Sequence, residues 1–347
     1  MGVLGASGQI GSQLLAMLSG HPHVSEIVPF SSTQQQPVSA ILPSLKHLGL
    51  PSFKNPKGFD FSALDCVFSC LPHGESFGYF SSIRHTPALF IDLSSDYRVA
   101  SAREYEEIHR QQHPAPEVLC DFVRIVPEIN GSDSRDHKWI SVPGCNATAV
   151  ILAMHPLLKE QALTDDAVIA DIKVSSSGSS ARRMDVAQLH YNRAGGVRVH
   201  RLLGAHRHTR EIAAYLCERL GVRTDIVINT YSVDMVRGIL ASCYCRCPPS
   251  FHNQRARAIY RDAYGSCDSI RIVRQFSGHQ MFPNPKYVIG TNFCDIGFEF
   301  DPSTGRGVVL AAIDNLIKGG AGNAMQVFNL HYGWNASLSV PHLPVYI

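Results

Sequence analysis

Cys145 combines a reactive side chain with a position that can activate it. It follows Pro143 and Gly144, directly before a segment with helical spacing at 147–158. Backbone N–H groups and the helix dipole stabilise a thiolate at the start of a helix. A buried, inert thiol is the ordinary interpretation of a cysteine, and we expect it for the other nine of the ten in the chain. Cys145 is therefore the predicted nucleophile.

A second group of reactive side chains lies within six residues, and it consists of His206, Arg207, His208, Arg210 and Glu211. Histidine supplies general acid/base catalysis near neutral pH, and this much positive charge suits an anionic substrate. A solvated start of a helix is the alternative, and a zinc site would need a third ligand that the sequence does not offer. The residues alone do not decide between His206 and His208 as the acid/base, and Glu211 could orient His206.

Three glycines at the start of the chain have the spacing of a dinucleotide-binding turn. Gly5, Gly8 and Gly11 lie between a short apolar segment and a helical pattern at 12–18. Glycine lets backbone N–H groups approach a pyrophosphate at a helix N-terminus, and strand, glycine turn and helix open a dinucleotide-binding unit. Only two apolar residues precede Gly5, so we expect the natural start of the chain to lie a few residues upstream.

The end of the second predicted strand indicates which nicotinamide cofactor is used. A site for NAD usually has an acidic residue there, which binds the ribose hydroxyls. Here Phe30 is followed by Ser31, Ser32 and Thr33, whose hydroxyls could meet a 2′-phosphate. The sequence therefore favours NADP, although the basic residue that usually accompanies this phosphate is absent nearby.

Three further segments could contact substrate or cofactor. Ser94, Ser95 and Arg98 follow a strand and could hold a phosphate, because the guanidinium fork matches its oxygens; a structural salt bridge would look the same. The serine-rich stretch 175–180 could be a substrate loop or a plain connection. The glycines within 319–322 could approach the cofactor or form a close helix contact.

The elements that must position these residues fall into two groups. Strands alternating with helix-compatible segments predict a parallel, doubly wound sheet, and we expect them at 26–30, 65–71, 88–93 and 139–142. Strands dominate the following part, which predicts a mixed α+β domain, and we expect them at 168–174, 226–233, 238–247, 286–300 and 307–313. A final helix at 313–332 is expected to return to the first domain.

The bulk composition excludes several classes of protein. The chain has 347 residues, 45% of them hydrophobic, and a net charge of +2, which suits two globular domains without the basic runs of a nucleic-acid-binding protein. No apolar run approaches the ~20 residues of a membrane helix. Dispersed cysteines indicate reduced thiols and hence a cytoplasmic protein. Cys243, Cys245 and Cys247 have the period of one strand face, so we expect no metal there.

At these residues the sequence resembles the N-acetyl-γ-glutamyl-phosphate reductase family, relatives of aspartate-semialdehyde dehydrogenase. The shared motifs cover nearly the whole chain, and they are GASGQIG, CLPHG, DLSSDYR, VPEING, VPGCNAT, GAHRHTREI, GTNFCDIGF and AIDNLIKGGAGNAMQVFN. The resemblance implies a Rossmann-type domain at 1–145 and 314–347, and an α+β catalytic and dimerisation domain at 146–313. It also implies NADP, a homodimer or homotetramer, and Cys145 as nucleophile.

The resemblance favours His206 as the acid/base, with Glu211 behind it. The residues expected to bind the cofactor are Gly5, Ser7, Gly8, Gln9, Ile10, Ser31, Pro72, Gly178 and Asn315. The residues expected to bind substrate or phosphate are Ser94, Arg98, Asn146 and His208.

Several stretches are more similar to the branch of this family that acts in carrier-protein-linked lysine biosynthesis. They are the region 175–209, the motif PNPKYVIGTNF and the ending after Trp334. That branch reduces an aminoadipyl or glutamyl phosphate whose amino group is attached to a small acidic carrier protein. A basic stretch would suit such a partner, or a phosphate-rich pocket, and it comprises Arg193, Arg198, Arg201, Arg207 and Arg210.

The resulting hypothesis is an NADPH-dependent reduction of an N-blocked ω-acyl phosphate to the semialdehyde and phosphate, through a thioester on Cys145. The substrate would be N-acetyl-γ-glutamyl phosphate in arginine biosynthesis, or carrier-linked α-aminoadipyl or glutamyl phosphate in lysine biosynthesis. Two alternatives are an aspartate-semialdehyde dehydrogenase-like enzyme with another substrate, and a dinucleotide-binding paralogue without catalysis. No nucleic-acid or membrane partner is expected.

Overall fold

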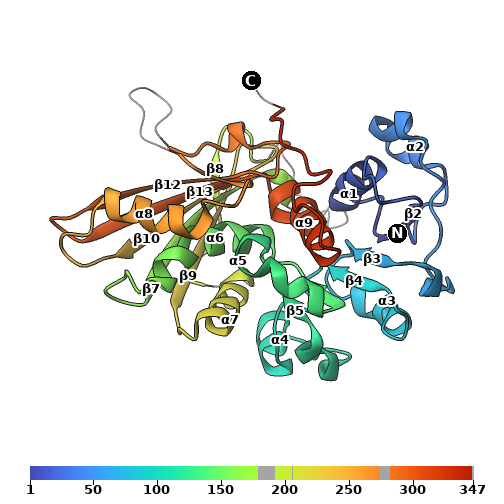
Figure 1. Ribbon diagram of the computed structural model, residues 1–347, viewed down its shortest axis with the longest axis horizontal. Coiled ribbons are helices and arrows are strands. Elements are labelled where there is room, and N and C mark those ends of the chain that lie inside the picture. Colours follow the sequence, from blue (N-terminus) through green and yellow to red (C-terminus); the bar gives the residue numbers. More distant parts are fainter. Residues whose placement is uncertain (179–191, 205, 274–281, 346–347) are drawn as a thin grey trace. The chain divides into compact units, whose positions relative to one another are not determined.

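The computed structural model describes residues 1–178, 192–204, 206–273 and 282–345, which form two compact units (Figure 1). Unit 1 consists of Met1–Pro143 and Gly320–Pro341. Unit 2 consists of Gly144–Gly319 and His342–Ile347. The chain therefore leaves unit 1 after Pro143, just before Cys145, and returns to it directly after Gly319.

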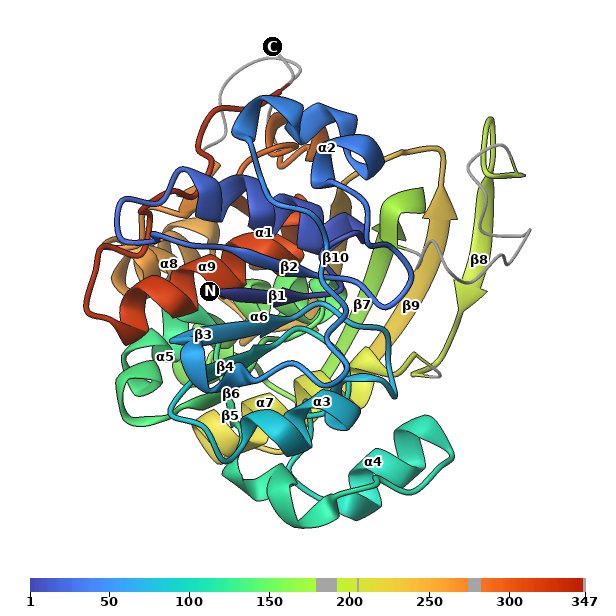
Figure 2. The ribbon, with the colours of Figure 1, turned by 90° about the vertical axis from the view of Figure 1, so that its right-hand side faces the viewer.

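Unit 1 contains a six-stranded sheet in the order β2-β1-β3-β4-β6-β5, in which all neighbouring strands are parallel (Figure 2). The strands are β1 (Gly2–Leu4), β2 (Val28–Phe30), β3 (Cys66–Ser69), β4 (Leu89–Asp92), β5 (Val123–Arg124) and β6 (Trp139–Ser141). The chain passes from β1 to β2 on one side and then to β3 on the other, so the strand order reverses beside β1. The predicted doubly wound parallel sheet is confirmed, and a ligand crevice is expected at the carboxyl ends of β1 and β3.

The helices of unit 1 pack apolar side chains against this sheet and against one another. The first helix buries Leu14, Leu15 and Leu18, which recur at helical spacing. The last one contacts the first, so the final helix returns to unit 1 as expected. These helices are α1 (Gln9–Ser19), α2 (Val38–Ile41), α3 (Ser76–Ile83), α4 (Ala102–His109), α5 (Pro127–Asn130) and α9 (Gly322–His331).

Aromatic rings form part of the core of unit 1 beneath the loop that follows β4. The ring of Tyr97 stacks on Phe122 with centroids 3.9 Å apart, and Phe80 lies 5.0 Å from Phe122 and 5.3 Å from Tyr97. Rings of this size bury a large apolar area in fixed orientations. The polar loop at 93–98 therefore rests on a rigid base.

Unit 2 contains a seven-stranded mixed sheet in the order β11-β12-β13-β10-β7-β9-β8. Neighbours are antiparallel except for the parallel pairs β7–β9 and β11–β12, so the predicted mixed domain is confirmed. The strands are β7 (Ala167–Val174), β8 (Val197–Arg201), β9 (Asp225–Val233), β10 (Ile239–Arg246), β11 (Ile270–Ile272), β12 (Cys294–Asp301) and β13 (Arg306–Ile313).

Three helices of unit 2 pack on the sheet and on one another, and they are α6 (Cys145–Lys159), α7 (His208–Leu220) and α8 (Asn253–Tyr264). Helix α6 contacts β10, β13 and the other two helices, and it is buried around its whole circumference, including every residue from 146 to 158. It begins at Cys145, two residues before the helical pattern of the sequence, because the Gly144 backbone is extended and Cys145 already has helical geometry.

Two predicted elements near the end of unit 2 are wrong. The strand expected at 286–300 starts only at Cys294, because Pro285–Tyr287 form a 3-10 turn and Gly290 takes a left-handed φ of 81°. The helix expected at 313–332 starts later as well. Ile313 still pairs with Ile239 and Cys294 as the last residue of β13. A π-helical turn, Ile317–Ala321, then precedes α9.

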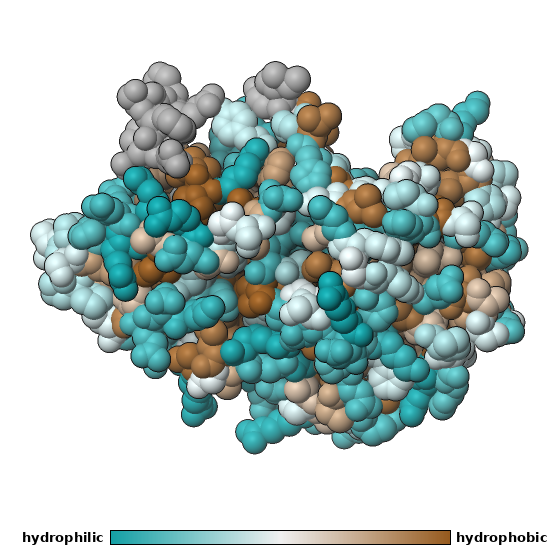
Figure 3. Space-filling view, viewed as in Figure 1, coloured by the Kyte–Doolittle hydropathy of each residue, from teal (hydrophilic) through white to brown (hydrophobic). Residues whose placement is uncertain are grey.

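None of the helices in the described ranges combines the length and apolar character that a membrane span requires. On the face shown in Figure 3, hydrophobic and hydrophilic residues are interspersed. All ten cysteines are free thiols, and Cys243, Cys245 and Cys247 are buried.

Candidate active site

The turn after β1 has the geometry of a pyrophosphate cradle. Gly5 has a φ of 72°, and a Cβ atom there would lie 2.8 Å from the carbonyl oxygen of Cys70. A Cβ atom on Gly11 would collide with the carbonyl oxygen of Gly5, so α1 packs closely on the turn. Gly8 is the N-cap of α1, and no side chain caps the helix there. Unshielded backbone N–H groups at this end are what a phosphate would bind.

The predicted residues Ser7, Gln9, Ile10 and Ser31 surround this turn. Gln9 and Ile10 are the first residues of α1. The hydroxyl of Ser31, directly after β2, lies 3.2 Å from that of Ser7 and accepts the backbone N–H groups of Thr33 and Gln34. Ser31 thus organises the loop in which an NAD site would carry an acid.

A basic residue near this loop could not be found from the sequence. Lys54 is exposed, and its backbone pairs with the end of β2: its carbonyl accepts the N–H of Ser31 at 3.0 Å. It lies 23 positions away in the chain, so the local pattern around Ser31 does not show it. Lys54 is a candidate for the basic partner of a 2′-phosphate.

Pro72 lies in the loop between β3 and α3, and this loop is fastened to Asp96. The Asp96 carboxylate accepts hydrogen bonds from Nδ1 of His73 at 2.8 Å and from the backbone N–H groups of Gly74 at 2.8 Å and Ser76 at 3.1 Å. Burial opposes ionisation of Asp96, but these hydrogen bonds prevail and lower its pKa. The predicted cofactor-binding loop is therefore held in one conformation.

Ser94 and Arg98 take part in structural hydrogen bonds. The Ser94 hydroxyl donates to Asp92 at 2.7 Å, and Arg98 donates to the backbone carbonyls of Leu93 at 2.7 Å and Val142 at 3.1 Å. Burial and the charge of Asp96 raise the pKa of Asp92 to about 7. Both predicted phosphate residues thus brace the loop after β4, and phosphate binding by them stays a prediction.

Cys145 is the first residue of α6, as its proposed chemistry requires. It is half-buried, and its Sγ lies 4.0 Å from Oδ1 of Asn146, which is itself buried. Gly144, the N-cap residue, has no side chain of its own to cap the helix. Cys145 thus lies in the first turn of a 15-residue helix, where N–H groups and the helix dipole favour negative charge.

Glu211 connects the histidine cluster to the nucleophile. Its buried carboxylate accepts the backbone N–H of Gly144 through Oε1 at 2.7 Å. Its Oε2 lies 3.8 Å from Nε2 of the buried His208. This ion-pair contact of Glu211 is thus with His208, whereas its predicted role behind His206 stays a prediction.

His206 precedes α7 and lies beside His208, with ring centroids 4.6 Å apart. Its Nδ1 accepts the backbone N–H of His208 at 3.2 Å, so a neutral ring carries its proton on Nε2. Burial and the neighbouring charges of Arg207, His200 and Arg201 lower the pKa of His206 to about 3. His206 is therefore neutral at physiological pH.

The other two predicted cofactor residues, Gly178 and Asn315, belong to unit 2. The side-chain oxygen Oδ1 of Asn315 accepts hydrogen bonds from the Gly238 N–H at 2.8 Å and from the hydroxyls of Ser175 and Ser177 at 3.2 and 3.3 Å. Asn315 thereby fixes the described part of the serine-rich loop, including Gly178. Residues 179 and 180 of that loop lie outside the described residues.

The predicted site residues thus form two sets. The set in unit 1 lies around the carboxyl ends of β1, β2, β3 and β4. The set in unit 2 comprises Cys145, Asn146, Gly178, His206, His208, Glu211 and Asn315. The first set resembles a dinucleotide site in its backbone, and the second provides a thiol, a neutral imidazole and a buried carboxylate.

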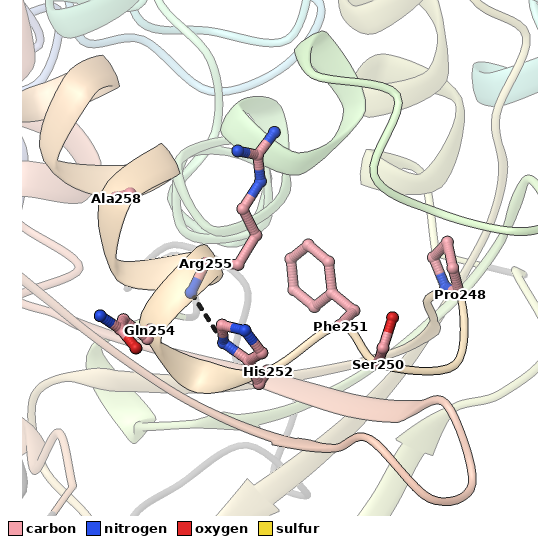
Figure 4. A pocket seen from close by; sticks show the side chains of 7 residues that line it. All are labelled: Pro248, Ser250, Phe251, His252, Gln254, Arg255 and Ala258. Atoms are coloured by element: carbon pink, nitrogen blue, oxygen red, sulfur yellow. Dashed lines mark hydrogen bonds between the residues drawn. The ribbon is translucent and has the colours of Figure 1, made fainter.

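A hollow elsewhere in unit 2 shares no residue with these sets. It has a volume of about 390 Å³ and lies at the start of α8, where His252 accepts the backbone N–H of Arg255 (Figure 4). Its lining is largely exposed and lacks an acid, a thiol or a glycine turn; it consists of Pro248, Ser250, Phe251, His252, Gln254, Arg255 and Ala258. This hollow therefore offers no group for thioester chemistry or dinucleotide binding. Among the described residues, no group of three or more histidine, cysteine or acidic side chains could hold a metal ion.

Comparison with known proteins identifies the family. Residues 1–137 match the domain described as semialdehyde dehydrogenase, NAD binding domain, and residues 145–315 match the semialdehyde dehydrogenase, dimerisation domain. The chain belongs to the semialdehyde dehydrogenase family. The resemblance inferred from the motifs is thereby confirmed.

Named relatives with similar sequences cover nearly the whole chain. A Thermococcus kodakarensis protein, named as a phosphate reductase for LysW-L-2-aminoadipate and LysW-L-glutamate, is 39% identical over 99% of this chain and 98% of its own length. The LysW-L-2-aminoadipate 6-phosphate reductase of Deinococcus radiodurans is 36% identical over 96% of this chain and 94% of its own.

Solved structures of semialdehyde dehydrogenases share the fold. Aspartate semialdehyde dehydrogenase II of Vibrio cholerae superimposes with a TM-score of 0.72 at 16% identity, covering 95% of this chain and 96% of its own. The Candida albicans aspartate semialdehyde dehydrogenase, solved with NADP, gives 0.70 at 16% identity, covering 96% and 98%. At this identity the likeness concerns the fold.

Proposed function

We propose that this protein reduces a carrier-linked aminoadipyl or glutamyl phosphate to the semialdehyde and inorganic phosphate, with NADPH as reductant. The observation that carries the proposal is the 36 to 39% identity, over at least 94% of each chain, to relatives named for this activity. The free substrate of the wider family, N-acetyl-γ-glutamyl phosphate, is the second candidate. It is favoured by motifs such as VPGCNAT and GAHRHTREI, which do not depend on a carrier.

Cys145 is the proposed nucleophile. Its thiolate attacks the acyl carbon, the bond from carbon to the phosphate oxygen breaks, and phosphate leaves with the electron pair. The product is a thioester, which accepts hydride far more readily than a carboxylate would. The start of α6 supports this step because its N–H groups and dipole favour the thiolate and negative charge that develops on the acyl oxygen.

His206 is proposed to act as a neutral hydrogen-bond donor. Nδ1 of His206 already accepts a hydrogen bond from the His208 N–H, and the lowered pKa of His206 opposes a second proton. Nε2–H is therefore the donor available to the substrate. A neutral imidazole can stabilise the oxyanion formed by hydride addition through donation from Nε2–H, and this oxyanion then collapses to the aldehyde and the Cys145 thiolate without a net proton transfer. Glu211 would support both the nucleophile and the histidine cluster. Its carboxylate accepts the N–H of Gly144, next to Cys145, and it lies beside His208.

The residues of unit 1 fit a nicotinamide dinucleotide. Side chains at Gly5 and Gly11 would fill the cradle that a pyrophosphate needs, and Ser31 with Ser7 replaces the acid of an NAD site. When bound, NADPH supplies the hydride that reduces the thioester. Gln9 and Ile10 would offer their N–H groups to the pyrophosphate, Pro72 would line the site, and Gly178 and Asn315 are further proposed contacts from unit 2.

Asn146 and His208 are the proposed substrate contacts of unit 2, and Ser94 and Arg98 those of unit 1. Asn146 has the most direct support, because its amide oxygen lies beside the thiol. The functional boundaries are proposed as 1–145 with 314–347 for dinucleotide binding, and 146–313 for catalysis and dimerisation. A homodimer or homotetramer is proposed from the family domain of unit 2.

A small acidic carrier protein is the proposed macromolecular partner. The basic stretch suits it: Arg198 and Arg201 lie on the exposed edge strand β8, and Arg207 and Arg210 are exposed on either side of His208. Arg193 differs, because it is buried and donates to the Val174 carbonyl at 3.3 Å. The free thiols agree with a reducing, cytoplasmic location.

The test runs the reaction in reverse and measures phosphate-dependent reduction of NADP. Two aldehydes are compared: N-acetylglutamate semialdehyde, and aminoadipate semialdehyde linked to the carrier. Turnover of only the carrier-linked aldehyde supports lysine biosynthesis and the basic docking surface. Turnover of the free acetylated aldehyde assigns arginine biosynthesis instead. Turnover of neither, by protein that binds NADP, contradicts the proposal and favours a paralogue without this activity.

A further inference from the structure

The turn after β13 packs its backbone directly against Cys145. A Cβ atom on residue 319 would lie 2.5 Å from Cys145 Cβ and 3.0 Å from Cys145 Cα. Non-bonded carbon atoms do not approach so closely, so glycine is needed at 319 to bring the turn this near. The backbone conformation of Gly319 is not left-handed, so the reason for glycine is space. Gly319 thus packs directly against the Cys145 side chain.

The turn that carries Gly319 is a π-helix. It spans Ile317–Ala321, and the N–H of Gly319 donates to the carbonyl of Asp314, five residues earlier, at 2.9 Å. Such turns are rare and frequently mark functional sites. The side chain of Asp314 supports this one.

Asp314 is fully buried, and its carboxylate both caps the turn and anchors it to the domain. Oδ1 accepts the N–H groups of Leu316 at 2.8 Å and Ile317 at 3.1 Å, at the entrance of the turn. Oδ2 accepts the N–H of Gly290 at 2.6 Å and forms an ion pair with Nε of Arg237 at 2.6 Å. A buried carboxylate is stable only with such partners, so each of them restrains the turn.

We propose that Asp314 is a positioning residue for Cys145 and acts through Gly319. This inference rests on the proposed function, since it takes Cys145 as the nucleophile. Asp314 fixes the π-helical turn, and the turn limits where the Cys145 side chain can lie. The sulfur is thereby kept at the start of α6, where the helix stabilises the thiolate. Neither Asp314 nor Arg237 needs to touch the substrate for this effect.

The experiment measures the rate at which iodoacetamide alkylates Cys145 in the full-length protein, followed by mass spectrometry of the peptide that contains it. The rate is recorded from about pH 6 to about pH 10, because its titration reports the thiolate at that one position. In G319A, Cys145 should be alkylated at least about tenfold more slowly, or the midpoint of the pH titration of its rate should shift, since small misplacements of a reactive group are costly. Its turnover should fall in parallel.

G78A is the matched control. Gly78 lies inside α3, and nothing lies within 4 Å of a Cβ atom placed on it, so alkylation should proceed at the wild-type rate. D314N keeps the size of the side chain but loses its charge, and it should also slow the alkylation. R237Q removes one partner of Asp314. Because Arg237 is partly exposed, this variant replaces G319A or D314N in the test if either of them fails to fold.

Wild-type alkylation and turnover in folded G319A or R237Q would overturn the inference. Failure of the proposed function looks different: the wild-type protein would then keep its activity after complete alkylation of Cys145. If alkylation abolishes activity but the variants react normally, only the role of Asp314 and Gly319 is rejected.

Discussion

Glu211 accepts a hydrogen bond from the backbone N–H of Gly144, the residue directly before Cys145, at 2.7 Å. The two residues are 67 positions apart, and each stands at the start of a helix, α7 and α6 respectively. A carboxylate that binds the N-cap residue of α6 fixes where that helix begins. The position of the nucleophile is therefore defined from a second element.

E211A should consequently lose activity through misplacement of Cys145. Removing the acceptor leaves a buried N–H unsatisfied, which costs roughly 1–3 kcal/mol, and kcat should fall about tenfold or more. E211Q keeps an oxygen at the same place and should retain more activity than E211A. Steady-state kinetics measure the loss of activity of each variant, and a thermal unfolding curve measures its loss of stability, so the two effects are separated. Equal activity of E211A and wild type would contradict this role of the carboxylate.

The pH dependence of His206 variants distinguishes a neutral donor from a titrating acid/base. The pKa of His206 is lowered to about 3 by burial and the nearby cationic side chains, so the ring stays neutral throughout the physiological range. H206A should reduce kcat about 10²-fold, by the same factor from about pH 5 to about pH 8, because a neutral donor is lost. A loss that changes with an inflection at about pH 6.5, the ordinary pKa of histidine, would show that His206 titrates there and would contradict the neutral role.

Much of this site could be predicted because its signals are local. The glycine turn and the start of α6 are each formed by residues that are close together in the sequence, and their chemistry follows from helix and turn geometry. The strand predicted at 286–300 is wrong in its first part, before Cys294, because an apolar pattern does not reveal that Pro285 and Gly290 turn the chain. The π-helical turn has no local signal because it depends on Asp314, whose partners Arg237 and Gly290 are distant in sequence.

The contacts that organise the site are long-range and therefore absent from any local pattern. The role of Glu211 behind His206 stays a prediction, and its contacts with Gly144 and His208 could not be read from spacing. Lys54 is brought to the end of β2 by strand-like pairing with a distant part of the chain. Such pairings come from tertiary packing, which periodicity does not encode.

Asp92 should make the stability of unit 1 depend on pH. Burial and the charge of Asp96 raise its pKa to about 7, above the usual value of an aspartate. The folded state therefore binds a proton that the unfolded state has already released between about pH 4 and pH 7. The stability contributed by protonated Asp92 is present at about pH 4 and is lost as the pH rises through about 7.

D92N imitates the protonated form and should remove this dependence. Thermal unfolding of D92N and wild type is compared at about pH 5 and about pH 8, and the variant should gain several degrees relative to wild type at the higher pH. S94A serves as a control, because it removes the hydroxyl that donates to Asp92 without neutralising the carboxyl group. The same difference in Tm at both pH values would mean that Asp92 does not titrate between them, which contradicts the prediction.

S31D should shift the cofactor preference from NADP toward NAD. An aspartate at the end of β2 can bind the ribose hydroxyls of NAD and repels a 2′-phosphate, whereas the serine does neither. The new carboxylate can keep the loop in place, since the Ser31 hydroxyl already accepts the N–H groups of Thr33 and Gln34, and a carboxylate oxygen can do the same. Kd for NADP should rise at least about tenfold, as expected for two negative charges brought together. Unchanged binding of both cofactors in titrations of S31D would place the ribose away from this residue.

K54E tests the basic partner of the same phosphate, and K57E is its matched control. Both lysines are exposed, but only Lys54 is paired by its backbone with the end of β2. Binding of NADP and NAD is measured by titration at low ionic strength, where the contribution of an exposed charge is largest. K54E should weaken NADP binding more than NAD binding and K57E should leave their ratio unchanged. An equal ratio in both variants would assign recognition of the 2′-phosphate to the hydroxyls of Ser31 and its neighbours alone.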